Sequence, residues 1–217
     1  MQHPRPHALI FDLDGLLVDS EPIWFEVEGG FLADLGHTWT RQEADACMGQ
    51  GTPNTLRIWR ERHGVDVDIE RDTERIIDRM IARADGMKLQ AGALSLLDRA
   101  KGENCRMAVA SSSPRRLIEA VLEAKGIRSF FEVVVSAQEV PRPKPAPDVF
   151  VRAGELLDVP MKSCVVLEDT LAGTRAGIDA GARVIAVPSV PSAALNALAT
   201  WVLHDLGEAI DVLFGDR

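Results

Sequence analysis

The spacing of apolar residues changes along the chain and separates three regions. Residues 7–12 form a short apolar run without a polar face, which is typical of a strand that is buried on both sides. Residues 22–83 carry apolar positions at helical spacing and contain no convincing strand. From Met87 onward, helical stretches alternate with short β-branched runs. These runs are residues 107–110, 133–135, 165–167 and 184–187, and residues 201–202 are expected to form a last edge strand.

Alternating helices and buried strands predict βαβ units around a parallel sheet. The strand at residues 7–12 resembles the later strands, so the helical stretch between them is expected to be an insertion. We therefore predict an α/β protein with a Rossmann-like parallel-sheet core, formed by residues 1–15 and 87–217, and an inserted helical-bundle cap at residues 16–86.

Composition narrows the function. The 217 residues are 46% hydrophobic and 26% charged, which is ordinary for a globular chain. The net charge of −9 argues against nucleic acid or an anionic membrane as a partner. The N-terminal residues lack the apolar core of a signal peptide, and no apolar run is long enough to cross a bilayer. Three cysteines without metal spacing favour a reducing cytoplasm over a disulfide framework.

The chain lacks the sequence patterns of two common kinds of catalytic site. Its five histidines fall outside any zinc-binding spacing, and no G-x-S-x-G nucleophile motif is present. Zinc and serine hydrolases are therefore poorly supported.

Two acids follow the first buried strand. Asp12 and Asp14 stand one residue apart and precede Gly15. In open α/β sheets, ligands bind at the carboxyl ends of the strands, where these carboxylates are expected to emerge. The alternative is a surface turn, because D-x-D-G is also a turn-forming sequence.

A serine-rich segment follows the strand at residues 107–110. Ser111, Ser112 and Ser113 precede Pro114, which suits the first turn of a helix. A helix start at a strand end offers N–H groups and hydroxyls to a phosphate. Plain helix capping would explain Ser113 equally well.

Lys144 lies among four prolines, directly before a predicted helix at residues 149–157. The prolines restrict the backbone and would hold the lysine in place for a fixed anion. A solvated loop lysine is the alternative, and Arg142 is expected to face solvent.

A second acidic pair, Glu168 and Asp169, follows the strand at residues 165–167 and precedes Thr170. Carboxylates in this position suit Mg²⁺, although an acidic helix N-terminus is also favoured by the helix dipole. The next helix has glycines at a spacing of four, which would let it approach the sheet closely. They are Gly173, Gly177 and Gly181.

Together these segments resemble the haloacid dehalogenase-like phosphatase superfamily. Its four motifs correspond to Asp12-Leu13-Asp14-Gly15, Ser111, Lys144 and Glu168-Asp169. Residues 11–24 and 110–114 are similar to the branch that acts on hexitol phosphates and 2-deoxyglucose 6-phosphate. Thr170 stands where the family usually has serine, and both residues can cap a helix.

The resemblance implies an Mg²⁺-dependent phosphatase that acts on a small phosphorylated metabolite. Asp12 would be the nucleophile that forms an aspartyl-phosphate, and Asp14 the general acid and base. Ser111, Ser112 and Lys144 would bind phosphate. Mg²⁺ would be held by Asp12, the backbone carbonyl of Asp14, and Asp169, with Glu168 a weaker or indirect ligand.

Substrate choice is expected to reside in the cap. Trp24 and the loop at residues 49–52 are the predicted substrate-facing elements. A β-phosphoglucomutase is the close alternative, but that family has a histidine at the position of Trp24, which argues for hydrolysis. A dehalogenase would not keep an acid at position 14. The acidic surface and complete core are compatible with a monomer.

A phosphoaccepting signalling domain also uses a strand-end aspartate with Mg²⁺ and lysine. Such a domain would be shorter, would draw its acidic pair from the first strand and would lack a cap. A non-catalytic binding protein is disfavoured because every chemical position is filled.

Overall fold

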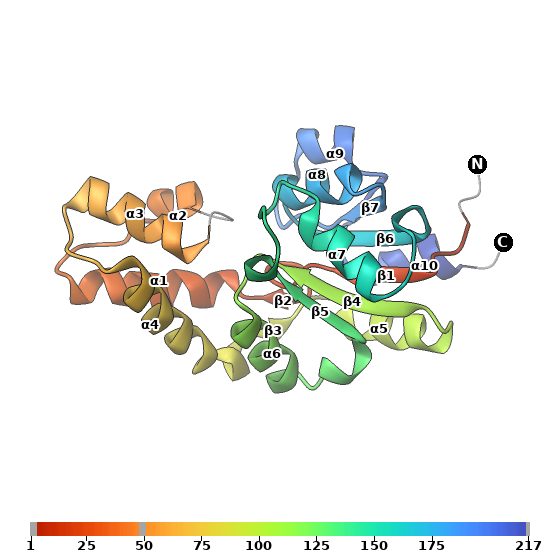
Figure 1. Ribbon diagram of the computed structural model, residues 1–217, viewed down its shortest axis with the longest axis horizontal. Helices are drawn as coiled ribbons and strands as arrows, with labels where there is room; N and C mark the ends of the chain where they lie inside the picture. Colours follow the sequence, from red (N-terminus) through yellow and green to blue (C-terminus); the bar gives the residue numbers. More distant parts are fainter. Residues whose placement is uncertain (1–3, 48–50, 216–217) are drawn as a thin grey trace. The chain divides into compact units, whose positions relative to one another are not determined.

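The computed structural model describes residues 4–47 and 51–215. Contacts divide the chain into two compact units, which are drawn in Figure 1. The first unit runs up to Asp19 and resumes at Lys88, and the second unit extends from Ser20 to Met87. The second unit is therefore inserted into the first one along the chain.

The first unit is built on a six-stranded sheet in the order β5-β4-β1-β6-β7-β8, and every neighbouring pair is parallel. This finding confirms the predicted α/β class. The strands are β1 (Ala8–Phe11), β4 (Arg106–Ser111), β5 (Val133–Ser136), β6 (Cys164–Glu168), β7 (Arg183–Ala186) and β8 (Trp201–Val202). The expected edge strand at residues 201–202 is thus present.

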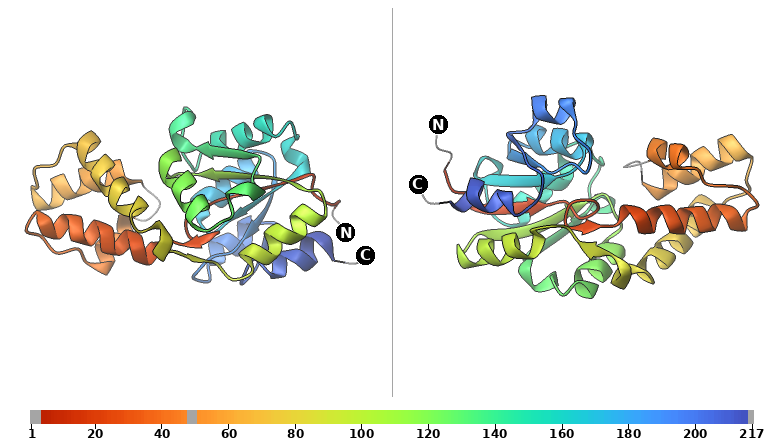
Figure 2. Two further views of the ribbon diagram at one scale, coloured as in Figure 1. Left: turned by 90° about the horizontal axis from the view of Figure 1, so that it is seen from below. Right: turned by 180° about the vertical axis from the view of Figure 1, so that it is seen from behind.

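Helices cover both faces of this sheet, as Figures 1 and 2 show. On one face α7 packs against β4, β5 and β1, and α8 packs against β6 and β7. On the other face α5 packs beneath β4, and α10 lies against α5. The helices of the unit are α5 (Ala93–Gly102), α6 (Arg115–Ala124), α7 (Asp148–Leu156), α8 (Leu171–Asp179), α9 (Ala193–Leu198) and α10 (Glu208–Phe214). Short 3₁₀ turns lie at Arg128–Phe130, Ala137–Glu139 and Met161–Ser163.

The strand β1 is apolar on both sides because both of its faces are covered. Ala8 and Ile10 belong to the core cluster that α7 closes with Phe150. Leu9 and Phe11 alternate with them and point to the opposite layer, and all four residues are fully buried. Each large side chain buried in this way contributes about 2 kcal/mol to the stability of the fold. The centre of the sheet is therefore a rigid base for the residues that follow its strands.

One element was not expected. Val18 and Asp19 form β2 (Val18–Asp19), which pairs antiparallel with β3 (Lys88–Leu89) where the chain leaves and re-enters the first unit. Two residues per strand are too few to show an alternating pattern in the sequence. The pairing places Val18 and Asp19 in the first unit, so the second unit begins a few residues after the predicted boundary at residue 16.

The second unit consists of helices packed on an aromatic core. Phe31 and Trp59 stack with ring centroids 6.1 Å apart, and Trp39 meets Trp59 edge-on at 5.1 Å. A Cβ on Gly29 would lie 3.3 Å from the Trp39 ring, so close packing explains one of two adjacent glycines inside a helix. The helices are α1 (Glu21–Asp34), α2 (Arg41–Cys47), α3 (Thr52–His63) and α4 (Ile69–Ile81), followed by a 3₁₀ turn at Ala84–Gly86.

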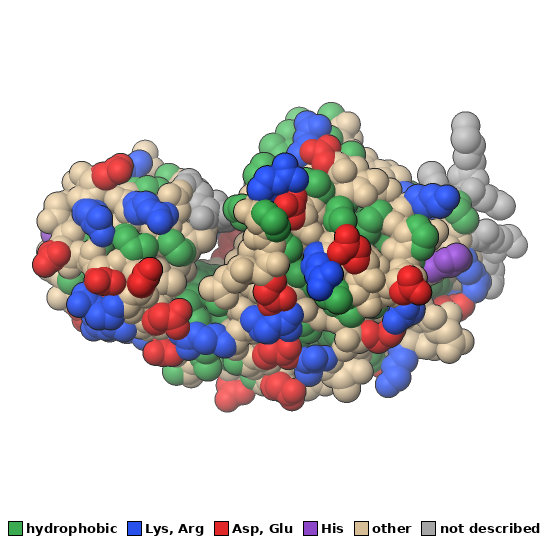
Figure 3. All heavy atoms as spheres, viewed as in Figure 1, with side chains coloured by type: hydrophobic (Ala, Val, Ile, Leu, Met, Phe, Trp, Pro, Cys, Tyr) green, Lys and Arg blue, Asp and Glu red, His purple; other side chains and the backbone are tan. Residues whose placement is uncertain are grey.

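Within residues 4–47 and 51–215, no helix combines the length and the apolarity that a bilayer crossing requires. On the face drawn in Figure 3, Lys and Arg side chains are interspersed with Asp and Glu rather than gathered in a patch.

The sheet order also fixes where a ligand can bind. β1 lies between β4 and β6, and Phe11 is level with Val109 on one side and Leu167 on the other. The chain changes direction across the sheet at β1, and the crevice at such a switch point is the usual ligand site of open α/β sheets. The residues that follow these three strands therefore face one another.

Candidate active site

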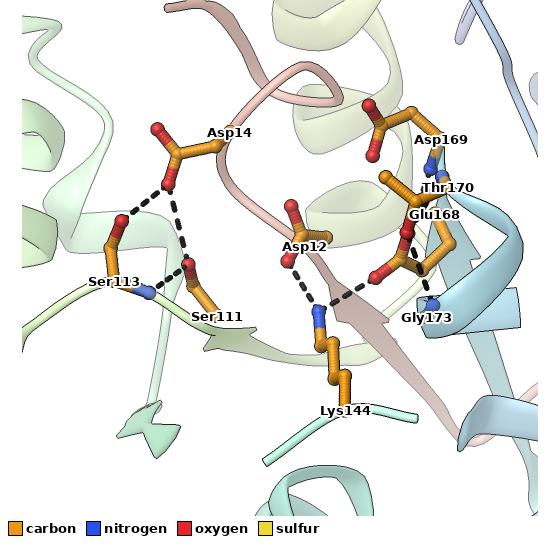
Figure 4. A network of polar contacts seen from close by, with 9 residues as sticks. All are labelled: Asp12, Asp14, Ser111, Ser113, Lys144, Glu168, Asp169, Thr170 and Gly173. Atoms are coloured by element: carbon orange, nitrogen blue, oxygen red, sulfur yellow. Dashed lines mark hydrogen bonds and ion pairs between the residues drawn. The ribbon is translucent and has the colours of Figure 1, made fainter. Parts of the chain in front are cut away.

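The carboxyl edge of the sheet brings most of the predicted site residues together, as Figure 4 shows. Lys144 Nζ contacts Asp12 Oδ1 and lies 2.6 Å from Glu168 Oε1. These three side chains are 6%, 8% and 1% exposed, respectively. One buried ammonium group therefore joins the first and the second acidic pair.

Asp12 is fixed by the sheet itself. Its N–H donates to the Leu167 carbonyl at 3.0 Å, which continues the β1–β6 ladder by one residue. Burial raises the pKa of the Asp12 carboxyl from 3.8 to about 7, with Lys144 opposing this shift and Glu168 and Asp14 adding to it. Near neutral pH, and without a bound metal ion, this carboxyl is therefore partly protonated.

Lys144 comes from the proline-rich loop before α7, and its peptide bond to Pro145 is cis. Burial alone would lower the pKa of its ammonium group, but Asp12 and Glu168 outweigh that effect and raise it. The ammonium also lies 4.7 Å from the centre of the Phe150 ring on α7. Arg142 in the same loop is exposed and pairs with Asp148 at 2.8 Å, away from Lys144.

Glu168 organises the turn that follows β6. Its Oε2 accepts hydrogen bonds from the backbone N–H of Asp169 and Thr170, both at 3.0 Å, and from Thr170 Oγ1 at 2.9 Å. Thr170 Oγ1 in turn accepts from the Gly173 N–H at 3.1 Å, so the predicted hydroxyl cap of α8 is confirmed. The carboxyl of Glu168 occupies the space where a Cβ of Gly173 would lie.

Each glycine in and after α8 is required for a different structural reason. Gly173 makes room for Glu168, whereas a Cβ on Gly177 would lie 2.9 Å from Val184 and 3.1 Å from Val166 on the sheet. The predicted close approach of helix and sheet is therefore confirmed at Gly177. Gly181 follows the end of the helix with φ of +88°, a conformation that glycine adopts without strain.

Asp169 is the least satisfied acid of the site. Its Oδ1 is buried and has no hydrogen-bond partner in the described part of the chain. Burial raises the pKa of Asp169 well above its usual value, and the charges of Glu168 and Asp12 add to the effect. Its carboxyl packs directly against Gly15, where a Cβ would lie 3.0 Å from Asp169 Cγ.

These features fit a divalent cation. Asp12 is buried and Asp169 is half-buried, the two acids repel each other, and the buried Oδ1 of Asp169 lacks a donor in the described part of the chain. Hard oxygen ligands of this type suit Mg²⁺. Within the described residues, the side chains do not form a preassembled group of three or more acidic, histidine or cysteine ligands. A backbone oxygen, such as the Asp14 carbonyl, would therefore have to complete the set.

Asp14 points away from Lys144, toward the serines that follow β4 (Figure 4). Ser113 Oγ donates to Asp14 Oδ2 at 2.7 Å, and Ser111 Oγ lies 3.5 Å from the same oxygen. Ser111 and Ser113 are buried, whereas Ser112 between them is exposed. Helix α6 begins at Arg115 with Pro114 as its N-cap and without a side-chain cap, so helix capping does not explain Ser113.

Two residues near the site were missed from the sequence. Helix capping was an equally good explanation of Ser113 in the sequence. Its position two residues after Ser111 could have indicated that both serines point the same way, because alternate residues of an extended chain share a face. Gln90 follows β3, and its side-chain amide donates to the Gly15 carbonyl at 2.7 Å. A lone glutamine after an unpredicted strand gave no signal.

The predicted substrate-facing residues belong to the second unit. Trp24 is half-buried on α1. In the loop at residues 49–52, residues 49 and 50 lie outside the described part of the chain, and Thr52 is the buried first residue of α3. Their participation in substrate binding remains a prediction.

The fold and the site define an α/β protein with a buried lysine between two acidic pairs at the carboxyl edge of a parallel sheet. Residues 9–187 match the haloacid dehalogenase-like hydrolase family. The chain belongs to that family.

Individual proteins agree with this assignment. Hexitol phosphatase B of Escherichia coli (strain K12) is 32% identical over 84% of this chain and 83% of its own length. The chloroplastic protein SUPPRESSOR OF QUENCHING 1 of Arabidopsis thaliana is 34% identical over 96% of this chain, which spans only 21% of that protein. The crystal structure of CbbY from Rhodobacter sphaeroides with phosphate has a TM-score of 0.85 and 29% identity, covering 94% of this chain and 96% of that one.

Proposed function

We propose that the protein is an Mg²⁺-dependent phosphatase that hydrolyses a sugar phosphate or sugar-alcohol phosphate through an aspartyl-phosphate on Asp12. The observation that carries the proposal is the difference between two acids one residue apart. Asp12 contacts the Lys144 ammonium, and Asp14 contacts the Ser113 hydroxyl. Different surroundings suit two carboxyls for two roles in one reaction. Membership in a hydrolase family and similarity to phosphatases support the reaction class.

In the first half of the reaction, an Asp12 carboxylate oxygen forms a bond to the phosphorus of the ester. The bond between phosphorus and the ester oxygen breaks, and the proton of Asp14 passes to that oxygen, so the alcohol leaves as a neutral molecule. Lys144 opposes the burial-driven rise in the pKa of Asp12 and offers a positive charge to the phosphoryl oxygens. The hydroxyl of Ser111 lies at the same edge and can donate a hydrogen bond to these oxygens. Ser112 is exposed, so its polar groups are accessible to the phosphoryl group as well.

In the second half, a water oxygen attacks the phosphorus of the aspartyl-phosphate. The proton of this water passes to Asp14, the bond between Asp12 and phosphorus breaks, and inorganic phosphate leaves. Asp14 thereby recovers the proton that it gave to the alcohol, and the carboxylate of Asp12 is regenerated. The cycle needs no other reactant than the ester and water.

Asp12, Asp169 and the Asp14 carbonyl would hold Mg²⁺, with Glu168 beside them. When bound, the ion supplies positive charge that neutralises the phosphoryl oxygens. Glu168 already binds Lys144 and the N–H groups of its own turn, so its first role is to position these groups.

The substrate class rests on the relatives. Hexitol phosphatase B is named for sugar-alcohol phosphates, and we carry that class over to this chain. Trp24 on α1 is our candidate for a residue that distinguishes between sugar phosphates. If Trp24→Ala left the order of preference among them unaltered, Trp24 would lose this role.

The test is a screen of phosphate release from sugar, polyol, nucleotide and two-carbon phosphates with Mg²⁺. We expect turnover that is greatest for a hexose or hexitol phosphate and that stops with a chelator or with Asp12→Asn. The proposal would be overturned if no phosphate ester of the panel released phosphate, or if the Asp12→Asn protein kept normal turnover. With β-glucose 1-phosphate, formation of glucose 6-phosphate without net phosphate release would instead indicate a mutase.

A further inference from the structure

Three buried serines lie on the Asp14 side of the carboxyl edge of the sheet. Ser111 ends β4 and is 1% exposed, Ser113 lies two residues further and is 7% exposed, and Ser136 ends β5 and is 0% exposed. Ser136 caps the 3₁₀ turn at Ala137–Glu139, but no helix cap accounts for the buried hydroxyls of Ser111 and Ser113. Their hydrogen bonds show instead that they form one connected support.

The support has Ser113 at its centre. The N–H of Ser113 donates to Ser111 Oγ at 3.1 Å, and Ser136 Oγ donates to the Ser113 carbonyl at 2.7 Å. Ser136 Oγ also accepts from the Gln138 N–H at 3.2 Å. Both backbone polar groups of Ser113 are therefore held by neighbouring strand ends, and its side chain is presented to Asp14 in a fixed direction.

Of Ser111 and Ser113, only Ser113 places its hydroxyl oxygen at a short hydrogen-bond distance from the Asp14 carboxyl. Ser113 Oγ lies 2.7 Å from Asp14 Oδ2, which is the usual length of an O–H···O hydrogen bond. Ser111 Oγ lies 3.5 Å from the same oxygen, which is beyond that range and leaves its hydroxyl available for another ligand. Figure 4 shows both serines on the Asp14 side and Lys144 on the Asp12 side.

The chemical type of the group that contacts Asp14 matters as much as its position. A hydroxyl can donate a hydrogen bond to a carboxylate, and after rotation it can accept one from a carboxylic acid. An ammonium group can only donate, so it would hold a carboxyl in its charged form. Asp14 must carry a proton at one stage and lack it at the next, and Ser113 can remain bonded to it at both stages.

We propose that Ser113 is a positioning residue for Asp14: its backbone is held by Ser111 and Ser136, and its hydroxyl fixes the Asp14 carboxyl during proton transfer to the leaving alcohol. The inference rests on the proposed phosphatase function. Ser113 does not need to touch the substrate in this role, and it acts through Asp14.

The leaving group supplies a test that a merely structural role would not satisfy. An alkyl phosphate releases a poor leaving group that needs a proton from Asp14, whereas p-nitrophenyl phosphate releases a stable phenolate that needs little help. For Ser113→Ala we expect kcat/KM to fall about 10- to 100-fold with a hexitol phosphate, the effect of losing one hydrogen bond to a charged group. With p-nitrophenyl phosphate the fall should be several-fold smaller.

A pair of variants of equal shape isolates the hydroxyl. Ser113→Thr keeps it and Ser113→Val replaces it by a methyl group. We expect Thr to retain most of the hexitol phosphate activity and Val to lose it, mainly in kcat rather than in KM. This comparison also decides the question if Ser113→Ala does not fold.

Ser192→Ala is the matched control for general destabilisation. Ser192 caps α9 through a hydrogen bond from Leu195 N at 3.4 Å and makes no contact with Asp14. Its removal should leave the ratio of the two activities unchanged. Equal losses on both esters in Ser113→Ala, or equal activities of Ser113→Thr and Ser113→Val, would overturn the role of Ser113. If the unmodified enzyme hydrolysed neither ester, the proposed function itself would fail.

Discussion

Replacing the proposed nucleophile should stabilise the protein while abolishing its activity. The folded protein binds a proton at Asp12 with a pKa of about 7, whereas the unfolded chain binds it at about 3.8. A group whose pKa is raised by folding contributes stability that is fully present below the lower value and is lost as the pH rises through the higher one. The metal-free protein should therefore weaken from about pH 4 upward and level off above about pH 7.

The size of the effect follows from the two pKa values. Their difference of about 3 units corresponds to about 4 kcal/mol over the full range, and to about 3 kcal/mol between about pH 5 and about pH 8. This is a large share of a typical free energy of unfolding of about 5 to 15 kcal/mol. Asp12→Asn has nearly the same shape and cannot ionise. The variant should lose that part of the pH dependence and be more stable than the wild type at about pH 8 in the presence of a chelator.

The assay must report on the first unit alone. Trp24, Trp39 and Trp59 lie in the second unit, so tryptophan fluorescence would mainly follow that unit. Glu28 in the second unit also has a pKa raised by burial, to about 7, and would add a slope of the same sign. Hydrogen exchange of the β1 and β6 amides, measured with a chelator across the pH range, avoids this mixture.

Asp169 contributes to the wild-type slope in the same direction, because its pKa is also raised. The informative quantity is therefore the difference between the wild type and Asp12→Asn. Parallel pH profiles for the two proteins would refute the reasoning, since they would mean that Asp12 ionises alike in the folded and unfolded states.

Two other substitutions test the same network. Lys144→Met should abolish phosphate release and lower the free energy of urea unfolding by about 3 to 5 kcal/mol at about pH 8, because Asp12 and Glu168 lose their shared cation; a loss below 1 kcal/mol would contradict this expectation. Thr170→Ala should cost about 1 kcal/mol through the lost cap of α8, whereas Thr170→Ser should be neutral, as thermal unfolding will show. If the serine and alanine variants melted together, the hydroxyl would have no part in stability.

The sequence was most informative where residue type alone carries the signal. The buried strands were visible because β1 and its neighbours are apolar on both faces, and this periodicity places Asp12 and Glu168 at one edge of the sheet. The β2–β3 ribbon was invisible, since its register depends on two distant dipeptides that have no periodicity of their own. Local pattern thus predicted the strands that burial dictates and missed the one that tertiary pairing dictates.

For the site, the sequence indicated which residues belong together but not how they are bonded. Ser112 and Ser113 are indistinguishable by type, yet only Ser113 is buried and bonded to Asp14. Their difference comes from the chain's direction after β4 and from Ser136 on the neighbouring strand. A hydrogen bond to a residue 23 positions away cannot be read from local sequence.

The charge balance of the site links its stability to its proposed cation. Lys144 contacts Asp12 and Glu168, and Asp169 lies beside Glu168 without an ammonium partner of its own among the described residues; burial first, and then the neighbouring acids, raise the pKa values of Asp12 and Asp169. A divalent cation binds only the ionised carboxyls and must displace those protons. The same group of acids that weakens the metal-free protein as the pH rises therefore strengthens cation binding. Gly15 and Gly173 permit this arrangement, because a side chain at either position would occupy the space of an acid carboxyl group.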